Sequence, residues 1–152
     1  MKRPELTSLD DIAIPAAFDW EAVEPIEVTP PQSDFVAPLT HYRQLCEDPS
    51  GPWSANVIEC AGRVVGFVMT AVETELSTSW IGGFVVDRGV QNRGIAGRAM
   101  ELLIDRARGE GMQHIALTCA PTNLVASRLY ARHGFVPTGE VEGVELVLAR
   151  DL

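Results

Sequence analysis

Hydrophobic positions in the middle of the chain follow the spacing of strands and then of a helix. Apolar runs at 55–60 and 64–73 flank the turn Ala61-Gly62-Arg63, which predicts a β-hairpin. A third run, 79–87, contains two adjacent glycines, which in a strand mark a bulge or the close approach of another chain. Apolar residues at helical spacing then predict a helix over 95–109.

The pattern continues as strand, helix and strand toward the C-terminus. The apolar run 114–119 predicts a central strand, and Thr122 or Asn123 caps a predicted helix that runs to His133. A last apolar run, 144–149, predicts the strand that closes the sheet. The order of these elements indicates one α+β sheet with helices packed on it.

The first third of the chain has weaker signals. A short strand is predicted at 11–14, and Asp19 is suited to cap a helix to Val28, although a proline inside that span implies a kink or an early stop. The proline-rich segment 29–33 predicts a loop. Apolar residues at helical spacing predict a further helix over 38–46.

Length and composition predict a single domain over 1–152, with 1–15 partly a tail. The chain is 46% hydrophobic and 22% charged, as in ordinary globular proteins. It has no apolar run of about 18 residues and no signal peptide, so we expect no contact with a membrane. Three widely spaced cysteines are typical of reduced thiols, which favours a cytoplasmic protein.

Negative charge is concentrated in the first sixty residues. They contain eleven of the 21 acidic residues and three of the 12 basic ones, so they carry most of the net charge of −9. Nucleic-acid binding needs a basic face, so it is not expected. A cationic substrate and a solubilising acidic surface are both compatible with this distribution.

A polar turn, Gln91 to Gly94, joins the strand over 79–87 to the helix over 95–109. Such a turn makes an anion site, because unpaired N–H groups and the helix dipole point at one place. The P-loop pattern is excluded, because Lys2 is the only lysine, and no Gly-x-Gly-x-x-Gly is present. The remaining pattern, Gln-x-x-Gly-x-Ala, predicts phosphate binding, with an ordinary glycine turn as the alternative.

A second motif identifies a family. The segment Asn123 to Phe135 contains Asn, Ala and Tyr on a helix that ends in Gly-Phe. Together with Gln-x-x-Gly-x-Ala, it makes residues 55–152 resemble the GCN5-related N-acetyltransferase (GNAT) superfamily. The resemblance implies an α+β fold with a mixed, mostly antiparallel sheet of six to seven strands. This sheet is splayed at a central bulge and flanked by about four helices.

Looser features narrow the resemblance. The segment from Trp20 to Ala37 and the tail from Phe135 to Val141, followed by Glu145, are similar to bacterial diamine, spermidine and spermine N-acetyltransferases. One position departs from that group. Those enzymes often carry a basic residue before the phenylalanine of the bulged strand, where this chain has Gly83.

The resemblance implies acetyl-CoA as co-substrate and a small amine as acceptor. Strand backbone would pair with the pantetheine arm, and turn N–H groups would hold the pyrophosphate. The implied cofactor-binding residues are Phe84, Val85, Val86, Gln91, Asn92, Arg93, Gly94, Ile95, Ala96, Gly97 and Asn123. The three histidines lack metal-ligand spacing, so no metal is expected.

Amine acetylation needs a proton acceptor for the amine and a proton donor for the thiolate. Tyr130 is implied as the donor. Some relatives carry a glutamate five residues before Asn123, but that position is Thr118, so Glu73 is a substitute candidate for the base. A solvent-exposed strand-end carboxylate is the alternative for Glu73. Glu27 is a candidate contact for the substrate ammonium.

The sequence thus predicts an N-acetyltransferase of small cationic amines, most simply polyamines, that acts by direct attack in a ternary complex. Amino acids, aminoglycosides and protein N-termini are alternative acceptors. A non-catalytic acyl-CoA sensor is the alternative from another class. A homodimer is compatible with the sequence, which does not determine the oligomeric state.

Overall fold

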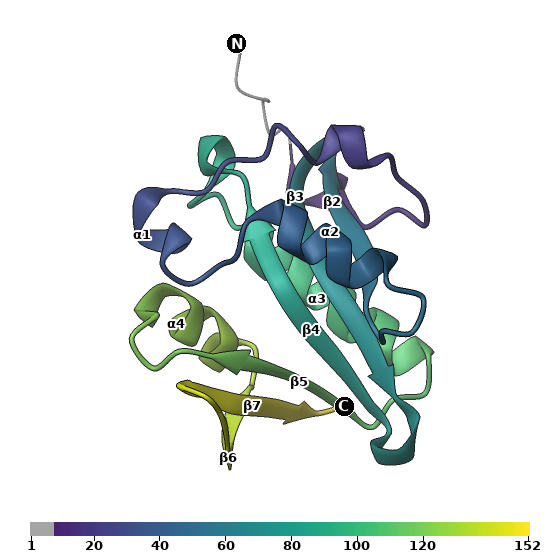
Figure 1. Ribbon diagram of the computed structural model, residues 1–152, viewed down its shortest axis with the longest axis vertical. Helices are drawn as coiled ribbons and strands as arrows, with labels where there is room; N and C mark the ends of the chain where they lie inside the picture. The colour runs from purple at the N-terminus through teal and green to yellow at the C-terminus, as the bar shows by residue number, and fades with distance from the viewer. Residues whose placement is uncertain (1–7) are drawn as a thin grey trace.

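A computed structural model, which describes residues 8–152, contains one seven-stranded sheet with helices on both faces (Figure 1). Residues 1–7, part of the predicted tail, lie outside the described residues. The strands are β1 (Ile12–Ala13), β2 (Ser54–Cys60), β3 (Arg63–Glu73), β4 (Thr78–Val86), β5 (His114–Cys119), β6 (Val136–Glu142) and β7 (Glu145–Asp151). The α-helices are α1 (Pro30–Ser33), α2 (Leu39–Glu47), α3 (Ile95–Gly109) and α4 (Leu124–Arg132).

The strands lie in the order β1-β2-β3-β4-β5-β7-β6, and only β4 and β5 are parallel neighbours. Parallel strands need a crossover connection, which α3 supplies. Residues from α3 and α4 pack together against one face of the sheet. The segment between β1 and β2, including α2, packs against the other face, and Figure 1 shows α2 in front of the sheet. The molecule therefore has three layers.

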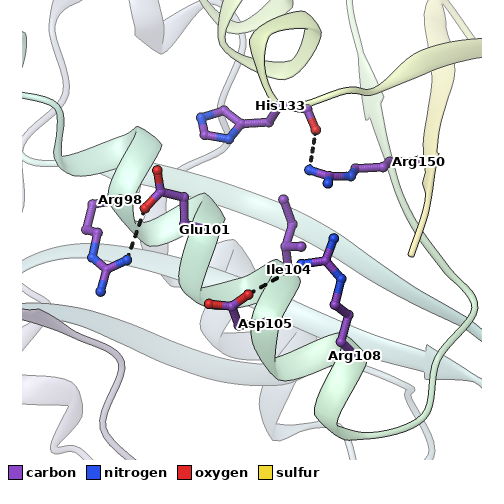
Figure 2. Close-up of a pocket in the computed structure, with 7 residues that line it drawn as sticks. All are labelled: Arg98, Glu101, Ile104, Asp105, Arg108, His133 and Arg150. Carbon is purple, nitrogen blue, oxygen red and sulfur yellow. Dashed lines mark hydrogen bonds and ion pairs between the residues drawn. The ribbon is translucent and has the colours of Figure 1, made fainter.

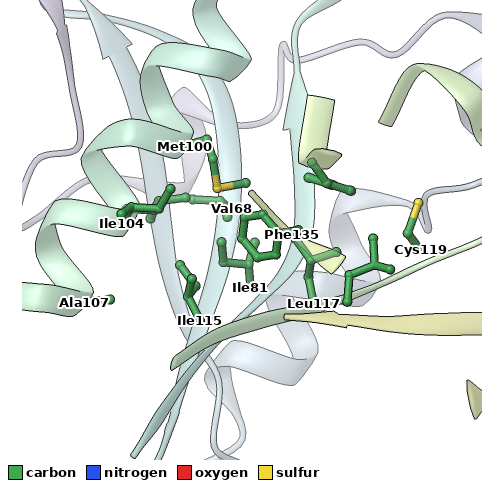
Figure 3. Packing of buried hydrophobic residues seen from close by; sticks show 12 residues of the cluster. Val68, Ile81, Met100, Ile104, Ala107, Ile115, Leu117, Cys119 and Phe135 are labelled. Atoms are coloured by element: carbon green, nitrogen blue, oxygen red, sulfur yellow. The ribbon is translucent and has the colours of Figure 1, made fainter. Parts of the chain in front are cut away.

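The largest buried cluster lies between α3, α4 and the central strands (Figure 3). Met100 and Ile104 of α3 contact a layer that includes Ile115 and Leu117 of β5. Phe135, just after α4, belongs to the same cluster. Burial of such side chains supplies about 1.5–3 kcal/mol each, so this cluster fixes where the two helices sit on the sheet.

The sheet opens between β4 and β5, and this opening positions the candidate site. The two strands pair only from Thr78–Ile81 to His114–Leu117. Beyond that point β4 stays with β3, whereas β5 stays with β7. The pairing of β4 with β3 also shifts by one residue around Gly83 and Phe84, which form a bulge. The bulge bends β4 away from β5.

Most predicted elements of the second half are confirmed. The hairpin, the helix over 95–109 and the strand over 114–119 form as predicted, and Asn123 caps α4 by accepting a hydrogen bond from the Ala126 N–H. In the first half, the helix predicted over 38–46 forms one residue further along, as α2. The predicted fold class is confirmed.

Three element predictions need correction. The helix from Asp19 to Val28 is reduced to a 3-10 turn over Trp20–Ala22, although Asp19 does cap it. The predicted loop 29–33 contains the one-turn helix α1, because proline is suited to a first helical turn. β6 had no predicted counterpart, since all its side chains are exposed and no apolar alternation marks it.

Candidate active site

The turn before α3 has the backbone geometry of an anion site. Asn92 and Gly94 both adopt left-handed conformations, with φ of 62° and 82°. α3 begins at Ile95 directly after Gly94, and no side chain caps the helix. The first N–H groups of α3 therefore have no capping side chain and remain available to a ligand.

The Gln91 side chain fixes this turn. Its Nε2 donates to the carbonyl of Val86 at 3.0 Å and to Oε1 of Gln32 at 2.5 Å. Gln91 therefore ties the turn to the end of β4 and to α1. This bracing explains why the motif begins with a glutamine, since the amide donates to both partners while the turn backbone stays open.

The other predicted residues of this turn and of the start of α3 differ in exposure. The side chains of Asn92 and Arg93 are exposed, whereas Ile95 is buried in the core with α3. Ala96 and Gly97 are partly buried on the first turn of α3. We therefore expect a bound anion to be held by the backbone N–H groups of this turn more than by its side chains.

The end of β4 offers one unpaired edge. Val85 pairs with Phe67, and Val86 pairs with Gly66, both on β3. On its other edge no described strand pairs with β4 beyond Ile81. The Val86 carbonyl already accepts from Gln91, so the part of this edge that faces the opening without a strand partner centres on Phe84, where an extended ligand could add as a strand.

Tyr130 lies on α4, the helix that follows β5. It is 8% exposed and packs edge-on against Phe135, with ring centroids 5.9 Å apart. Burial raises the pKa of the Tyr130 phenol, and nearby Cys119 and Glu145 raise it further. The hydroxyl therefore stays protonated throughout the neutral range. Burial likewise raises the pKa of the Cys119 thiol, which keeps it neutral.

Glu145, which the sequence marked only as part of the resemblance and not as a site residue, lies next to the opening. The Thr118 hydroxyl on β5 donates to Oε2 of Glu145 on β7 at 2.6 Å. The Glu145 charge also contributes to the raised pKa values of Tyr42 and Tyr130, after the larger effect of burial. Glu145 is only partly exposed. Its strand was predicted, but no sequence signal pairs it with Thr118, 27 residues earlier.

Gly83 explains a departure from the resembled enzymes. Its φ is 54°, and a Cβ placed there would lie 3.1 Å from Cδ1 of Tyr42. Tyr42 is held in place, because its hydroxyl accepts a hydrogen bond from the Ala37 N–H at 2.8 Å and its ring stacks on Phe67. A basic side chain at residue 83 would be strained and crowded.

The structure does not bring Glu73 to the opening. Glu73 is exposed at the far end of β3, paired with Thr78, about five residues along β4 from Gly83 and so roughly 16 Å away. Glu27 lies beside the residues after β4. Its carboxylate is 3.9 Å from Nη1 of Arg88, and its side chain is 71% exposed.

A hollow of about 310 Å³ lies between α3 and the end of α4 (Figure 2). Its charged groups are largely paired with one another. Arg98 contacts Glu101 at 3.0 Å, and Arg150 donates to the carbonyl of His133 at 2.7 Å. Arg108 lies 3.5 Å from Asp105. None of the predicted site residues lines this hollow, so it is separate from the opening between β4 and β5.

Residues 8–152 contain no cluster of three or more His, Cys, Asp or Glu that could hold a metal ion. Within the same residues, no helix has the length and apolar character needed to cross a bilayer.

Comparisons with known proteins agree with the fold and the turn. The acetyltransferase (GNAT) family matches residues 14–135. No curated protein matches the sequence. A GCN5-related N-acetyltransferase from Kribbella flavida has a similar structure, with a TM-score of 0.71 and 24% identity over 95% of this chain and 100% of that one.

Two other solved structures are similar in fold. The PaiA N-acetyltransferase of Thermoplasma acidophilum, in complex with coenzyme A, has a TM-score of 0.70 and 11% identity, over 93% of this chain and 99% of that one. The ribosomal-protein-S18-alanine N-acetyltransferase of Escherichia coli has a TM-score of 0.69 and 20% identity, over 92% of each chain.

The family match spans most of the chain and includes both the anion turn and the Asn123–Phe135 motif. The chain therefore belongs to the acetyltransferase (GNAT) family, and it is an acetyl-CoA-dependent acetyltransferase. The Escherichia coli relative is named for an alanine of a ribosomal protein, whereas the names of the other two specify no acceptor, so membership leaves the acceptor open.

Proposed function

We propose that the protein transfers an acetyl group from acetyl-CoA to a primary amine of a small cationic acceptor, most simply a polyamine. The observation that carries this proposal is the opening between β4 and β5. It has an anion turn at one end, a free strand edge along one side and a protonated tyrosine on the other side.

The turn and strand fit the two ends of the co-substrate. Pyrophosphate carries charge that open N–H groups at a helix N-terminus bind well. The pantetheine arm is extended and contains amide groups, so it can hydrogen-bond to the backbone of Phe84, Val85 and Val86. Asn123 caps α4 through its side chain, so its contribution is to position the helix that carries Tyr130.

Tyr130 supplies the proton that the leaving thiolate needs. Because its pKa is raised, the phenol is almost wholly protonated at neutral pH and is available as a donor. The acceptor amine attacks the acetyl carbon directly, so both substrates must be bound together.

The cationic acceptor is supported by charge. The first sixty residues carry most of the net negative charge. The segment between β1 and β2, including α2, covers the face of the sheet on which Tyr42 contacts Gly83. A polycation would be attracted over this surface. The three free cysteines are consistent with a reducing, cytoplasmic setting.

The test is thiol release from acetyl-CoA with a panel of amines. We expect spermidine to be used more efficiently than a monoamine of similar length at low ionic strength. The apparent KM for spermidine should rise with salt, because exposed charges are screened beyond about 10 Å at 0.1 M. More efficient acetylation of an amino acid or another neutral amine would contradict the polyamine proposal and leave the acetyltransferase assignment intact.

A further inference from the structure

We propose that Glu145 of β7 is the proton acceptor for the substrate amine. It replaces the glutamate that some resembled enzymes carry on β5, where this chain has Thr118. This inference rests on the proposed function, because it names the base of the same site. Nothing in the anion turn or in the Asn123–Phe135 motif assigns a role to Glu145.

β5 pairs with β7 along its whole length, so Thr118 has a neighbour on β7. Thr118 stands where some resembled enzymes carry a glutamate, so β5 itself offers only a hydroxyl. In the sheet, Thr118 pairs with Val147. Glu145 is two residues before Val147 on β7, so its side chain lies on the same face of the sheet. The 2.6 Å hydrogen bond from Thr118 then brings the carboxylate back to the position that the missing glutamate would occupy.

The side chains of Thr118 and Glu145 point to the same face of the sheet. Leu117 and Cys119 belong to the core under α3 and α4, so Thr118 between them points to the opposite face of the sheet. Leu146 and Leu148 pack toward that same core, so Glu145 also points to the opposite face. This is the face that α2 covers with Tyr42.

Three titratable side chains lie close enough to Glu145 to be affected by its charge. The Glu145 charge reaches Tyr42 on one side of the opening and both Cys119 and Tyr130 on the other. None of these three groups is a cation. The carboxylate is therefore not neutralised by a basic partner among the contacts that the structure records, and Thr118 leaves its second oxygen free to accept a proton.

An alkylammonium has a pKa of about 10.4, so it must first lose a proton, which Glu145 accepts. The amine nitrogen then bonds to the acetyl carbon as the carbon–sulfur bond breaks. Tyr130 donates its proton to the departing sulfur, the nitrogen releases its second proton to solvent, and solvent restores both side chains. The net products are the acetamide, coenzyme A with a free thiol, and one proton.

The first variant is Glu145→Gln, with Glu142→Gln as the matched control. Glu142 pairs with Glu145 across the β6–β7 hairpin but is exposed, so its variant removes an equal charge from the same hairpin. We expect Glu145→Gln to lower kcat by roughly 100-fold or more at pH 7, with acetyl-CoA affinity unchanged. Glu142→Gln should behave as the wild type.

The pH profile separates a base from a merely structural carboxylate. As the pH approaches about 10, the amine loses its proton without help, so the reduction in kcat that Glu145→Gln causes relative to the wild type should become smaller. A deficit that stays constant with pH, or wild-type turnover by Glu145→Gln at pH 7, would overturn the inference.

The swap Thr118→Glu with Glu145→Thr provides the second test. It returns the carboxylate to β5 and keeps the hydroxyl on β7, so turnover should recover to within about tenfold of wild type. A swap that folds and binds acetyl-CoA yet is no faster than Glu145→Gln would also contradict the proposal. If wild-type protein releases no thiol with any amine, the proposed function itself fails, which is a different outcome.

Discussion

The two sides of the opening are built in different ways. The co-substrate side is one continuous stretch, from the end of β4 through the turn into α3. The acceptor side brings together Tyr42, Gly83, Thr118 and Glu145 from four separate elements. A contiguous site can be read from its spacing, whereas a dispersed site becomes visible only when the strands are paired. The predictions below test this contrast.

The largest effect is expected from Gly94→Glu, at the centre of the contiguous side. The position has φ of 82°, and a Cβ would lie 3.2 Å from Leu9. A carboxylate would also repel the pyrophosphate. Acetyl-CoA should bind at least about 100-fold more weakly, which corresponds to about 2.7 kcal/mol and is measurable by calorimetry.

The matched control is Gly62→Glu. Gly62 also has φ of 82° but has no atom within 4 Å of a Cβ, and it lies in the β2–β3 turn. Both variants carry the same backbone strain and the same added charge. Equal acetyl-CoA affinity in the two variants would show that the turn is not the phosphate site.

Tyr130→Phe should have the next largest effect. It removes only the hydroxyl, so acetyl-CoA affinity should persist while kcat falls roughly 10- to 1000-fold. Because the pKa of Tyr130 is raised, wild-type activity should not decline through ionisation of this phenol up to about pH 10. Wild-type turnover by the phenylalanine variant would make Tyr130 a core residue only.

The same contrast between contiguous and dispersed features explains which parts of the fold and site the sequence predicted. α3 and β5 were predicted with their observed bounds because their apolar spacing reflects burial on one face. The anion turn was predicted because its function depends on backbone conformation at a glycine. β6 was not predicted, because its residues are all exposed. The contact of Glu145 with Thr118 was not predicted, because only the β5–β7 register places the two residues side by side.

A polar cluster under the far end of α3 should affect stability without affecting the site. Asn56 is 9% exposed, accepts a hydrogen bond from Nη1 of Arg106 at 2.8 Å and donates to Oγ1 of Thr70 at 3.0 Å. Asn56→Leu would leave these partners unsatisfied, at a cost of about 1–3 kcal/mol.

Chemical denaturation should show this loss as a lower midpoint with an unchanged slope. Thr70→Val, which removes one partner but leaves the Arg106 bond, should cost less. Asn56→Leu protein that folds should bind acetyl-CoA with wild-type affinity. Weakened binding in a folded variant would indicate that the sheet transmits strain from this cluster to β4.

The smallest effects are expected from Glu73→Gln and Glu27→Gln. Both residues are acidic and were selected from sequence, but Glu73 lies at the far end of β3 and Glu27 forms a solvent-exposed ion pair with Arg88. Exposed carboxylates of this kind contribute little beyond long-range attraction. We expect kcat to change by less than about twofold in either variant, and the KM for a cationic amine to rise slightly at low salt. A large fall in kcat for Glu73→Gln, with Glu145→Gln unaffected, would reverse the contrast, because the base would then be the strand-end carboxylate that was selected from the sequence.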